Sequence, residues 1–222
     1  SLLAGIDYAY PQGVQIGGLA SALEGNTLFV DQDLHYSGLV GVALQGNIQV
    51  DTIVAQGSRP IGSPMTITHC EDQILHQLDN QPAVQVLVAL YQSLLPRDQE
   101  RMRYGLQLGV AATELKEQLK PGDFLIRNVI HLDQERGFLA VGENLRQGQT
   151  VQFHLRDAAA ASEDLTDLLE HYQLSRAATP PVGALLFTCT GRGQGFFGQP
   201  DHDSDTFFQS VGEVPLGGFF CG

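Results

Sequence analysis

The chain has 222 residues, of which 43% are hydrophobic, and its formal net charge is −13. This length can bury a substantial core in one large domain or two small ones. A chain so acidic lacks the basic field that holds a phosphate backbone, which excludes nucleic acid as an expected partner. No run approaches the roughly 18 apolar residues of a membrane span, so we expect no membrane insertion.

The cysteines indicate the redox environment. Cys70, Cys189 and Cys221 are odd in number and far apart, unlike a disulfide framework, so we expect free thiols. No charged-then-apolar leader opens the chain. Together these features predict a cytoplasmic location.

In chain order, turn residues and apolar spacing predict first a helix and then strands. The expected elements are a helix over 2–10 ended by Pro11, strands over 38–44 and 48–55 joined by a tight Gln-Gly-Asn turn, a strand over 65–69, and a helix from Pro82 to Leu95. The residues after Pro96 are rich in charge, so we place the best internal boundary between Pro96 and Arg103.

The second half reads as strands followed by helices. We expect a strand over 106–110, a short helix over 113–119, a hairpin of 124–132 with 138–141, a strand over 150–155, and a strand over 184–187. Asp157 is well placed to cap a helix over 158–172, and Asp203 or Ser204 can cap the helix after the last of these strands.

This pattern predicts an α+β fold with mainly antiparallel hairpin sheets flanked by helices. The Val-x-x-Gly-Gly spacing at Val14–Gly18 resembles Val214–Gly218, and paired glycines suit a crowded backbone crossing. We therefore expect two related modules, residues 1–100 and 101–222.

The most informative stretch runs from Gly183 to Ser204, where an apolar strand stops at Cys189 and becomes a glycine-rich loop carrying Arg192 and His202. It resembles the C-terminal part of the FIST family (F-box and intracellular signal transduction). Further similar segments are 122–128, 148–157 and 214–221 in the C-terminal module, and 17–21, 41–44 and 56–62 in the N-terminal one.

Two positions depart from the family pattern. The family has a cysteine where this chain has Ser58, and usually an asparagine where it has Thr190. The chain starts partway into the N-terminal module and stops at Gly222, where the family normally continues. We therefore expect a partial N-terminal module over 1–100 and most of the C-terminal module over 101–222.

Positive charge is scarce, so arginines inside the family motifs are candidates for binding a ligand carboxylate in bidentate geometry. Glycine amides of the loop could complete such a site. The predicted ligand-binding residues are Arg127, Asn128, Arg156, Asp157, Cys189, Gly191, Arg192, Gly193, His202, Asp203 and Ser204. The alternative is that each arginine pairs with a local acid, as Arg127 could with Asp123 or Glu143.

Other chemistries receive less support. Cys189 and His202 could form a nucleophile and base, but the sequence does not bring them together. His69 and Cys70 are adjacent rather than spaced for a metal, and His202 has no nearby ligand at a recognised separation. The glycine pattern lacks the lysine of a phosphate loop. We expect no catalytic residue, no metal and no cofactor.

The resemblance implies a sensory protein that binds a small ligand, with amino acids or their derivatives as candidates, and that acts on a signalling partner. A non-catalytic interaction scaffold or adaptor is the alternative, because family members are joined to F-box modules. A cysteine-dependent hydrolase is a third reading.

Overall fold

The computed structural model describes residues 2–22, 25–112, 123–175 and 180–222. It is an α+β protein that divides into two compact units. One unit is formed by residues 55–165, and the other by residues 1–54 together with 166–222. The long helix α4 (Ala158–Ser175) contributes to both units, because the division falls within it.

The unit of residues 55–165 is built on a seven-stranded antiparallel sheet in the order β3-β9-β6-β7-β8-β4-β5. Its strands are β3 (Ser58–Glu71), β4 (Ile74–Leu78), β5 (Gln81–Pro82), β6 (Leu106–Ala111), β7 (Phe124–Asp133), β8 (Phe138–Val141) and β9 (Thr150–Arg156). The first part of β3 pairs with β9 and its last part with β4, so the sheet closes on itself. Gly62, at φ +65°, lies where the β3–β9 register shifts.

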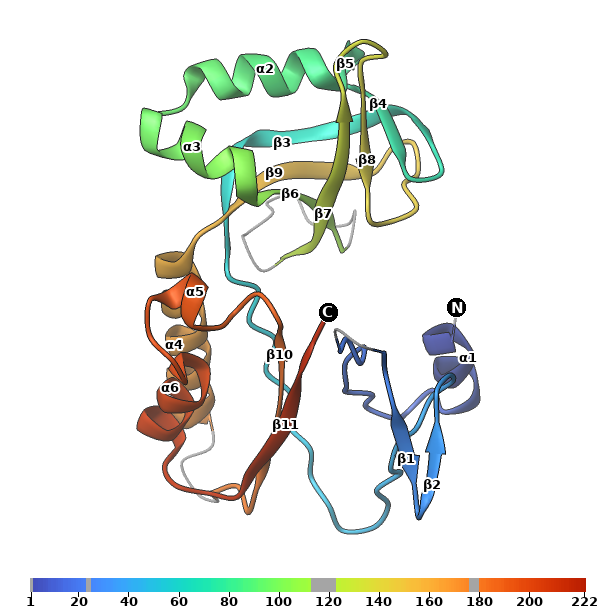
Figure 1. Cartoon of the computed structure of the whole chain (residues 1–222), viewed down its shortest axis with the longest axis vertical. Helices are drawn as coiled ribbons and strands as arrows, with labels where there is room; N and C mark the ends of the chain where they lie inside the picture. Colours follow the sequence, from blue (N-terminus) through green and yellow to red (C-terminus); the bar gives the residue numbers. More distant parts are fainter. Residues whose placement is uncertain (1, 23–24, 113–122, 176–179) are drawn as a thin grey trace. The chain divides into compact units, whose positions relative to one another are not determined.

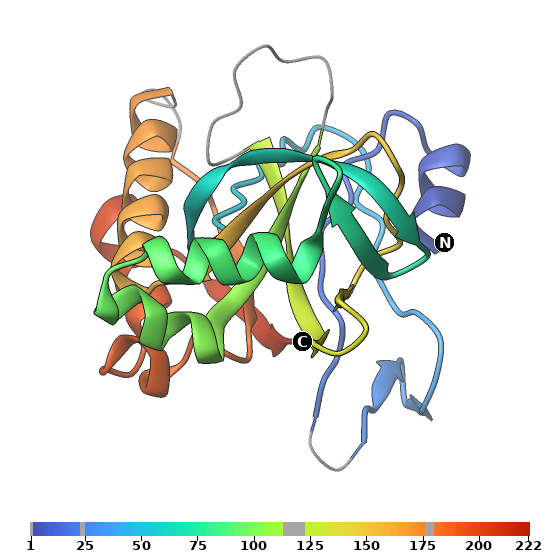
Figure 2. The same cartoon turned by 90° about the horizontal axis from the view of Figure 1, so that it is seen from above.

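Two helices, α2 (Ala83–Ser93) and α3 (Pro96–Gly105), pack on one face of this sheet next to each other (Figures 1 and 2). Pro82 and Pro96 stand at their starts, where proline's fixed φ and missing N–H cost nothing. Val84 and Leu87 of α2 and Met102 of α3 join strand residues in one apolar core. That core includes Leu108 and Phe153, which face each other across β6 and β9.

The other unit contains α1 (Leu2–Ala9), the hairpin of β1 (Leu28–Val30) with β2 (Asp33–His35), and the parallel pair β10 (Ala184–Cys189) and β11 (Leu216–Cys221). Between β10 and β11 the chain forms α5 (Gln194–Phe197) and α6 (His202–Val211). Helix α6 lies beside the C-terminal part of α4 (Figure 1), where Gln173 donates to the Ser210 carbonyl. Ala20 forms an antiparallel bridge with Cys221.

Most predicted elements are confirmed. The helix at the N-terminus, α2, the β7–β8 hairpin, β6, β9, α4 and β10 occur where the sequence placed them, and the strand predicted over 65–69 is part of the longer β3. The helix predicted over 113–119 lies outside the described residues.

Two predictions are wrong. No strand occurs over 38–55, and side chains such as Val42 and Val54 are exposed there, 87% and 73% respectively. Apolar segments beside a turn do not form strands without a partner to hydrogen-bond. Neither Asp203 nor Ser204 caps α6: Asp201 holds the N-cap position, at φ 55°, and Asp203 lies inside the helix.

The segment around Gly18 is not a strand equivalent to β11, so the relation between the two modules stays a prediction.

Candidate functional site

The glycine-rich loop after β10 folds around a buried ion pair. Arg192 reaches Asp203, on the first turn of α6, with Nε 2.7 Å from Oδ2 and Nη2 2.8 Å from Oδ1. Thr188, on β10, donates its hydroxyl to the same Oδ2 at 2.8 Å. Both members of the ion pair are nearly buried, since their side chains are 12% and 9% exposed. The pair therefore joins the loop, the end of β10 and α6.

His202 completes this cluster. Its Nδ1 lies 3.1 Å from Asp203 Oδ1, and its ring stacks on Phe197 with 3.6 Å between the ring centroids. The Arg192 guanidinium lies over the same phenyl ring, 5.1 Å from its centroid. Burial alone would raise the pKa of Asp203, but the hydrogen bonds from Arg192, His202 and Thr188 outweigh it and lower the pKa. The carboxylate is thus charged and fully engaged at neutral pH.

The remaining predicted residues of this loop lie around the cluster. Cys189 is exposed, and its sulfur accepts a weak hydrogen bond from the Gly191 N–H at 3.5 Å. Gly193 stands at the N-cap of the short α5, and the Ser204 hydroxyl donates to the Asp201 carbonyl. The loop residues Cys189, Arg192, His202 and Asp203 therefore lie in and around one cluster, in which Asp203 is the ion-pair partner of the arginine. Their predicted role in ligand binding stays a prediction.

Arg127 and Asn128 lie on β7 in the unit of residues 55–165 and make different contacts. Arg127 Nε is 2.6 Å from Glu143 Oε2, and its Nη1 donates to the Ile126 carbonyl. Asn128 accepts a hydrogen bond from the Gln107 side chain at 3.2 Å. Arg127 thus forms the local ion pair that the sequence left open as an alternative.

Asp157 links the start of α4 to two arginines. Its Oδ1 accepts from the backbone N–H groups of Ala159 and Ala160 at 3.0 and 3.3 Å, which confirms the predicted cap. Its Oδ2 pairs with Arg101 and lies 3.7 Å from Arg59 Nε. Burial alone would raise the pKa of Asp157, but those N–H bonds and the two cations outweigh it and lower the pKa.

Arg156 precedes this cap and faces Ser58 across the β3–β9 pair. A Cβ on Gly105 would lie 3.0 Å from the Arg156 Cβ, so glycine allows α3 to end close against β9. The predicted site residues thus fall into three groups: Arg127 with Asn128, Arg156 with Asp157, and the β10–α6 cluster.

A polar row on the sheet was not predicted as a site. Strand register aligns Pro60, His154, Gln107 and Asn128 across β3, β9, β6 and β7. Side chains opposite one another on paired antiparallel strands share a face, and this face is opposite the one that carries Leu108 and Phe153. We call the side chains of His154, Gln107 and Asn128, together with Ser58 at the end of β3, the polar row.

His154 is the buried centre of the polar row. It is 0% exposed, and its Nδ1 lies 3.2 Å from the Ser58 hydroxyl. Its Nε2 has no hydrogen-bond partner among the described residues. Burial lowers the pKa of His154 to about 4, so the ring is neutral at physiological pH.

Gln107 has the same incomplete bonding. Its Nε2 donates to Asn128, but its buried Oε1 has no partner within the described part of the chain. Gly109, two residues along β6, makes room for the histidine: a Cβ there would lie 2.7 Å from His154 Nε2 and 3.0 Å from Phe124 Cβ. Within the described part of the chain, the polar row therefore holds one imidazole nitrogen and one amide oxygen that are buried without a hydrogen-bond partner.

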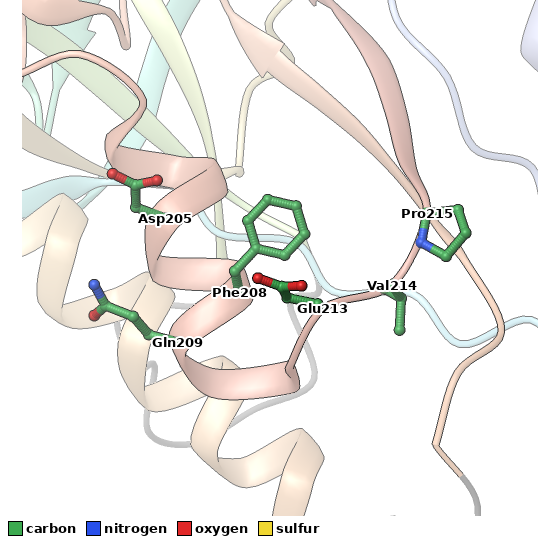
Figure 3. Close-up of a pocket in the computed structure, with 6 residues that line it drawn as sticks. All are labelled: Asp205, Phe208, Gln209, Glu213, Val214 and Pro215. Atoms are coloured by element: carbon green, nitrogen blue, oxygen red, sulfur yellow. The ribbon is translucent and has the colours of Figure 1, made fainter.

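Two hollows lie away from the predicted residues. A pocket of about 580 Å³ is lined by Asp205, Phe208 and Gln209 of α6 and by Glu213, Val214 and Pro215 before β11 (Figure 3). Among the described residues its lining carries two carboxylates and no cation, and these carboxylates would repel an anionic ligand. A groove of about 420 Å³ lies between α2, α3 and β7, with Leu87, Met102 and Leu132 among its apolar lining residues.

Within the described ranges, no group of three or more His, Cys, Asp or Glu side chains is placed to hold a metal ion. None of the helices in the same ranges is long and apolar enough to cross a membrane.

Comparison with known families covers nearly the whole chain. The FIST N domain matches residues 1–81, and the FIST C domain matches residues 83–222. The chain belongs to the FIST family. FIST domains are generally regarded as sensory domains of signal transduction. The two matches meet at residues 81–83, ahead of the 96–103 segment where we placed the module boundary.

Similar proteins occur in bacteria and in a plant. An uncharacterized protein of Mycobacterium tuberculosis is 41% identical over 214 residues, covering 95% of this chain and 55% of the relative. One from Mycobacterium bovis is 38% identical over 214 residues, with the same coverage. An F-box/LRR-repeat protein of Arabidopsis thaliana is 30% identical over 110 residues, 48% of this chain and 21% of its own length. The chain spans about half the length of its mycobacterial relatives, and no solved structure matches it.

Proposed function

We propose that this FIST chain is a sensory module that binds a small ligand at the polar row, and that it has no catalytic role. The observation that carries the proposal is the pair of buried atoms, His154 Nε2 and Gln107 Oε1, that lack partners among the described residues. A buried polar atom without a hydrogen bond costs about 1–3 kcal/mol. A ligand that bonds to these atoms would recover that energy on binding.

The bonding capacity of the row indicates the ligand's polar groups. Gln107 Oε1 is an acceptor, so it requires an N–H or O–H donor. His154 Nε2 is a donor or an acceptor according to whether Nδ1 accepts from or donates to Ser58. Amino acids and their derivatives, which the family resemblance implies, carry such donors. A neutral imidazole with a pKa of about 4 is also a poor general base at neutral pH, which favours binding over catalysis.

The anion site predicted around Arg127, Arg156 and Arg192 stays a prediction. Arg127 is paired with Glu143 and Arg192 with Asp203, so a ligand carboxylate would have to displace an existing carboxylate. Arg192 is the more difficult to reach, because its partner also holds Thr188. This competition favours recognition through the neutral polar row. A cytoplasmic location and a signalling partner belong to the same proposal.

The test is a thermal-shift screen of the full chain against the amino acids and their carboxamides, followed by calorimetric titration of any hit. A ligand at a hundred times its Kd adds about 2.7 kcal/mol to the stability of the folded state. Gln107→Met keeps the length of the side chain and removes the free acceptor. We expect the variant to lose the ligand-induced shift while the unliganded protein stays about as stable, because the lost bond to Asn128 is exposed and removing an unsatisfied acceptor costs little.

Gln73→Met is the matched control, since Gln73 is exposed on the turn between β3 and β4. It should keep the full ligand response. A ligand that binds wild type and Gln107→Met with equal affinity would refute the polar row as the site. A screen without any hit would favour the scaffold function.

The scaffold alternative rests on a different feature, the apolar groove between α2, α3 and β7. Val88 and Ile130 line it and are 42% and 64% exposed, so the groove presents apolar surface to solvent. The likeness to an F-box/LRR-repeat protein fits such a role. Val88→Ser with Ile130→Ser should abolish binding of a signalling partner under the scaffold hypothesis, and should leave small-ligand binding unchanged under the sensory one.

A further inference from the structure

The parallel strands β10 and β11 both end in a cysteine. Cys189 is the last residue of β10, Cys221 is the last of β11, and the two are direct register partners. Neighbouring strands lie about 4.8 Å apart, and residues in register present their side chains on the same face. Two residues that are 32 positions apart in the sequence thus form a side-by-side pair of free thiols.

Contacts around the pair agree with this placement. The Cys221 thiol donates a weak hydrogen bond to the carbonyl of Thr188, the neighbour of Cys189, at 3.4 Å. Burial raises the pKa of Cys221, and the nearby Cys189 raises it further, as expected for two thiolates that would repel each other. On its other side, Cys221 lies against Gly18, where a Cβ would be only 2.6 Å from the Cys221 Cβ.

The two thiols differ in accessibility. Cys189 is exposed, whereas Cys221 is half-buried. A reagent in solution therefore meets Cys189 first. Cys221 is then positioned to react with a modified Cys189 rather than with the reagent itself. This is the arrangement of an attacking and a resolving cysteine.

We propose that Cys189 and Cys221 are a redox site that closes to an intramolecular disulfide when the protein meets a peroxide. The Cys189 thiol loses its proton, and the resulting thiolate attacks hydrogen peroxide. The O–O bond breaks, a sulfenic acid forms, and the departing hydroxide takes up that proton as water. The Cys221 thiol then attacks the Cys189 sulfur. The S–O bond breaks, the S–S bond forms, and the thiol proton leaves with the hydroxyl group as water. Two thiols and one peroxide thus give one disulfide and two waters.

The strand geometry permits this bond. Disulfide-linked residues have Cα atoms about 4.4–6.8 Å apart, and adjacent strands place register partners about 4.8 Å apart. The strands need not separate, because only the side chains turn. The sulfur hydrogen bonds at Thr188 and Gly191 are the ones given up, and such bonds are weak.

Cys70 provides an internal control. It lies on β3 in the unit of residues 55–165, where its register partner is Leu75 and burial raises the pKa of its thiol. It is half-buried, as Cys221 is. If exposure alone decided which thiol reacts with the oxidised Cys189, Cys221 would have no advantage over Cys70.

The test is to treat the reduced full chain with one to a few equivalents of hydrogen peroxide and to count free thiols, followed by peptide mapping without reduction. We expect the count to fall from three to one, with a peptide that joins Cys189 to Cys221 and with Cys70 still free. Cys70→Ser should leave the disulfide yield unchanged, whereas Cys189→Ser and Cys221→Ser should each abolish it.

Three outcomes would overturn the proposal: a disulfide that includes Cys70, cross-linked dimers in place of the internal bond, or oxidation of Cys189 to the sulfinic acid with Cys221 still reduced. Folding of each serine variant is checked by circular dichroism. The disulfide is detected directly, by the mass of the linked peptide. A change in folding therefore cannot be mistaken for disulfide formation.

Discussion

Replacing Asp203 with asparagine removes one charge from the cluster that joins β10, the glycine-rich loop and α6. The carboxylate accepts two bonds from Arg192 and one from Thr188, with His202 beside it. Asparagine keeps one oxygen but places an NH₂ group where a second oxygen faced a donor. A hydrogen bond to a charged group contributes about 1.5–3 kcal/mol, and removing one member of a buried ion pair costs about 3–5 kcal/mol. We expect Asp203→Asn to lower the free energy of unfolding by about 2–4 kcal/mol.

The loss should depend on pH in a definite direction. The native pKa of Asp203 is lowered, so the native state favours the ionised form. An unfolded aspartate has a pKa of about 3.9. The stabilisation is therefore fully present above about pH 4 and is lost as the pH falls through the lower native value. The difference between wild type and variant should be constant near neutrality and shrink below about pH 4.

Urea unfolding followed by circular dichroism, at pH 7 and at steps down to about pH 3.5, measures both effects. Asp205→Asn is the matched control, because Asp205 is an exposed acid in the same first turn of α6. It should cost no more than about 1 kcal/mol, the scale of a helix-dipole interaction. Equal losses in the two variants would refute the idea that the buried ion pair, rather than helix charge, stabilises this region.

Three further predictions concern the other unit. Asp157→Ala removes the α4 cap and the partner of Arg101, so we expect the free energy of unfolding in urea to fall by about 3 kcal/mol. The control Asp167→Ala changes an exposed residue and should lower it by less than about 0.5 kcal/mol. Similar losses in the two variants would contradict the prediction. Gly109→Ala should cost about 1–3 kcal/mol because its methyl meets His154, whereas Gly142→Ala, with its nearest contact at 3.7 Å, should cost clearly less by the same measurement. The His154 ring, with a pKa of about 4, should show no NMR titration between pH 5 and 8. Its contribution to the free energy of unfolding should fall as the pH drops from about 6.5 toward 4. Titration of the ring near pH 6.5 would show that it is solvated.

Local signals predicted the elements that are closed by nearby residues. The β7–β8 hairpin joins strands separated by a short turn, and its ends were predicted to within one residue. Asp157 caps α4 through amides two and three residues away. In both cases the partners lie within a few residues, so sequence spacing carries the information.

The strand pair expected over 38–55 shows where such reasoning fails. Two apolar segments flank Gln45-Gly46-Asn47, which has the composition of a tight hairpin turn. A strand, however, also requires a neighbour to pair its backbone and a core to cover its apolar face. Val42, Leu44 and Val54 have no such cover, as their exposure shows. Apolar content and turn composition therefore do not by themselves establish a hairpin, even between neighbouring segments.

The same limit hid the polar row. Residues 150–156 alternate, and the alternation correctly separates Val151, Phe153 and Leu155 from Gln152 and His154. A polar face on a strand is normally read as facing water, but here Gln152 and His154 are buried as well. Ser58, which contacts His154, comes from 96 residues earlier in the chain. The one sequence signal was that Ser58 stands where the family has a cysteine. The sequence did not show that Ser58 contacts His154, because only the fold brings the two residues together.

The arginines explain why the predicted anion site and the observed contacts differ. In a chain with 25 acids and 12 bases, an arginine has many carboxylates within reach once the chain is folded. Arg59, Arg101, Arg127 and Arg192 each pair with one. A carboxylate ligand must then compete with a partner held by the fold and must approach against the net negative field. A ligand recognised by neutral amide and imidazole groups meets neither obstacle. Under the proposed sensory function, the neutral groups that lack partners among the described residues are therefore better candidates for ligand contact than the positive charges.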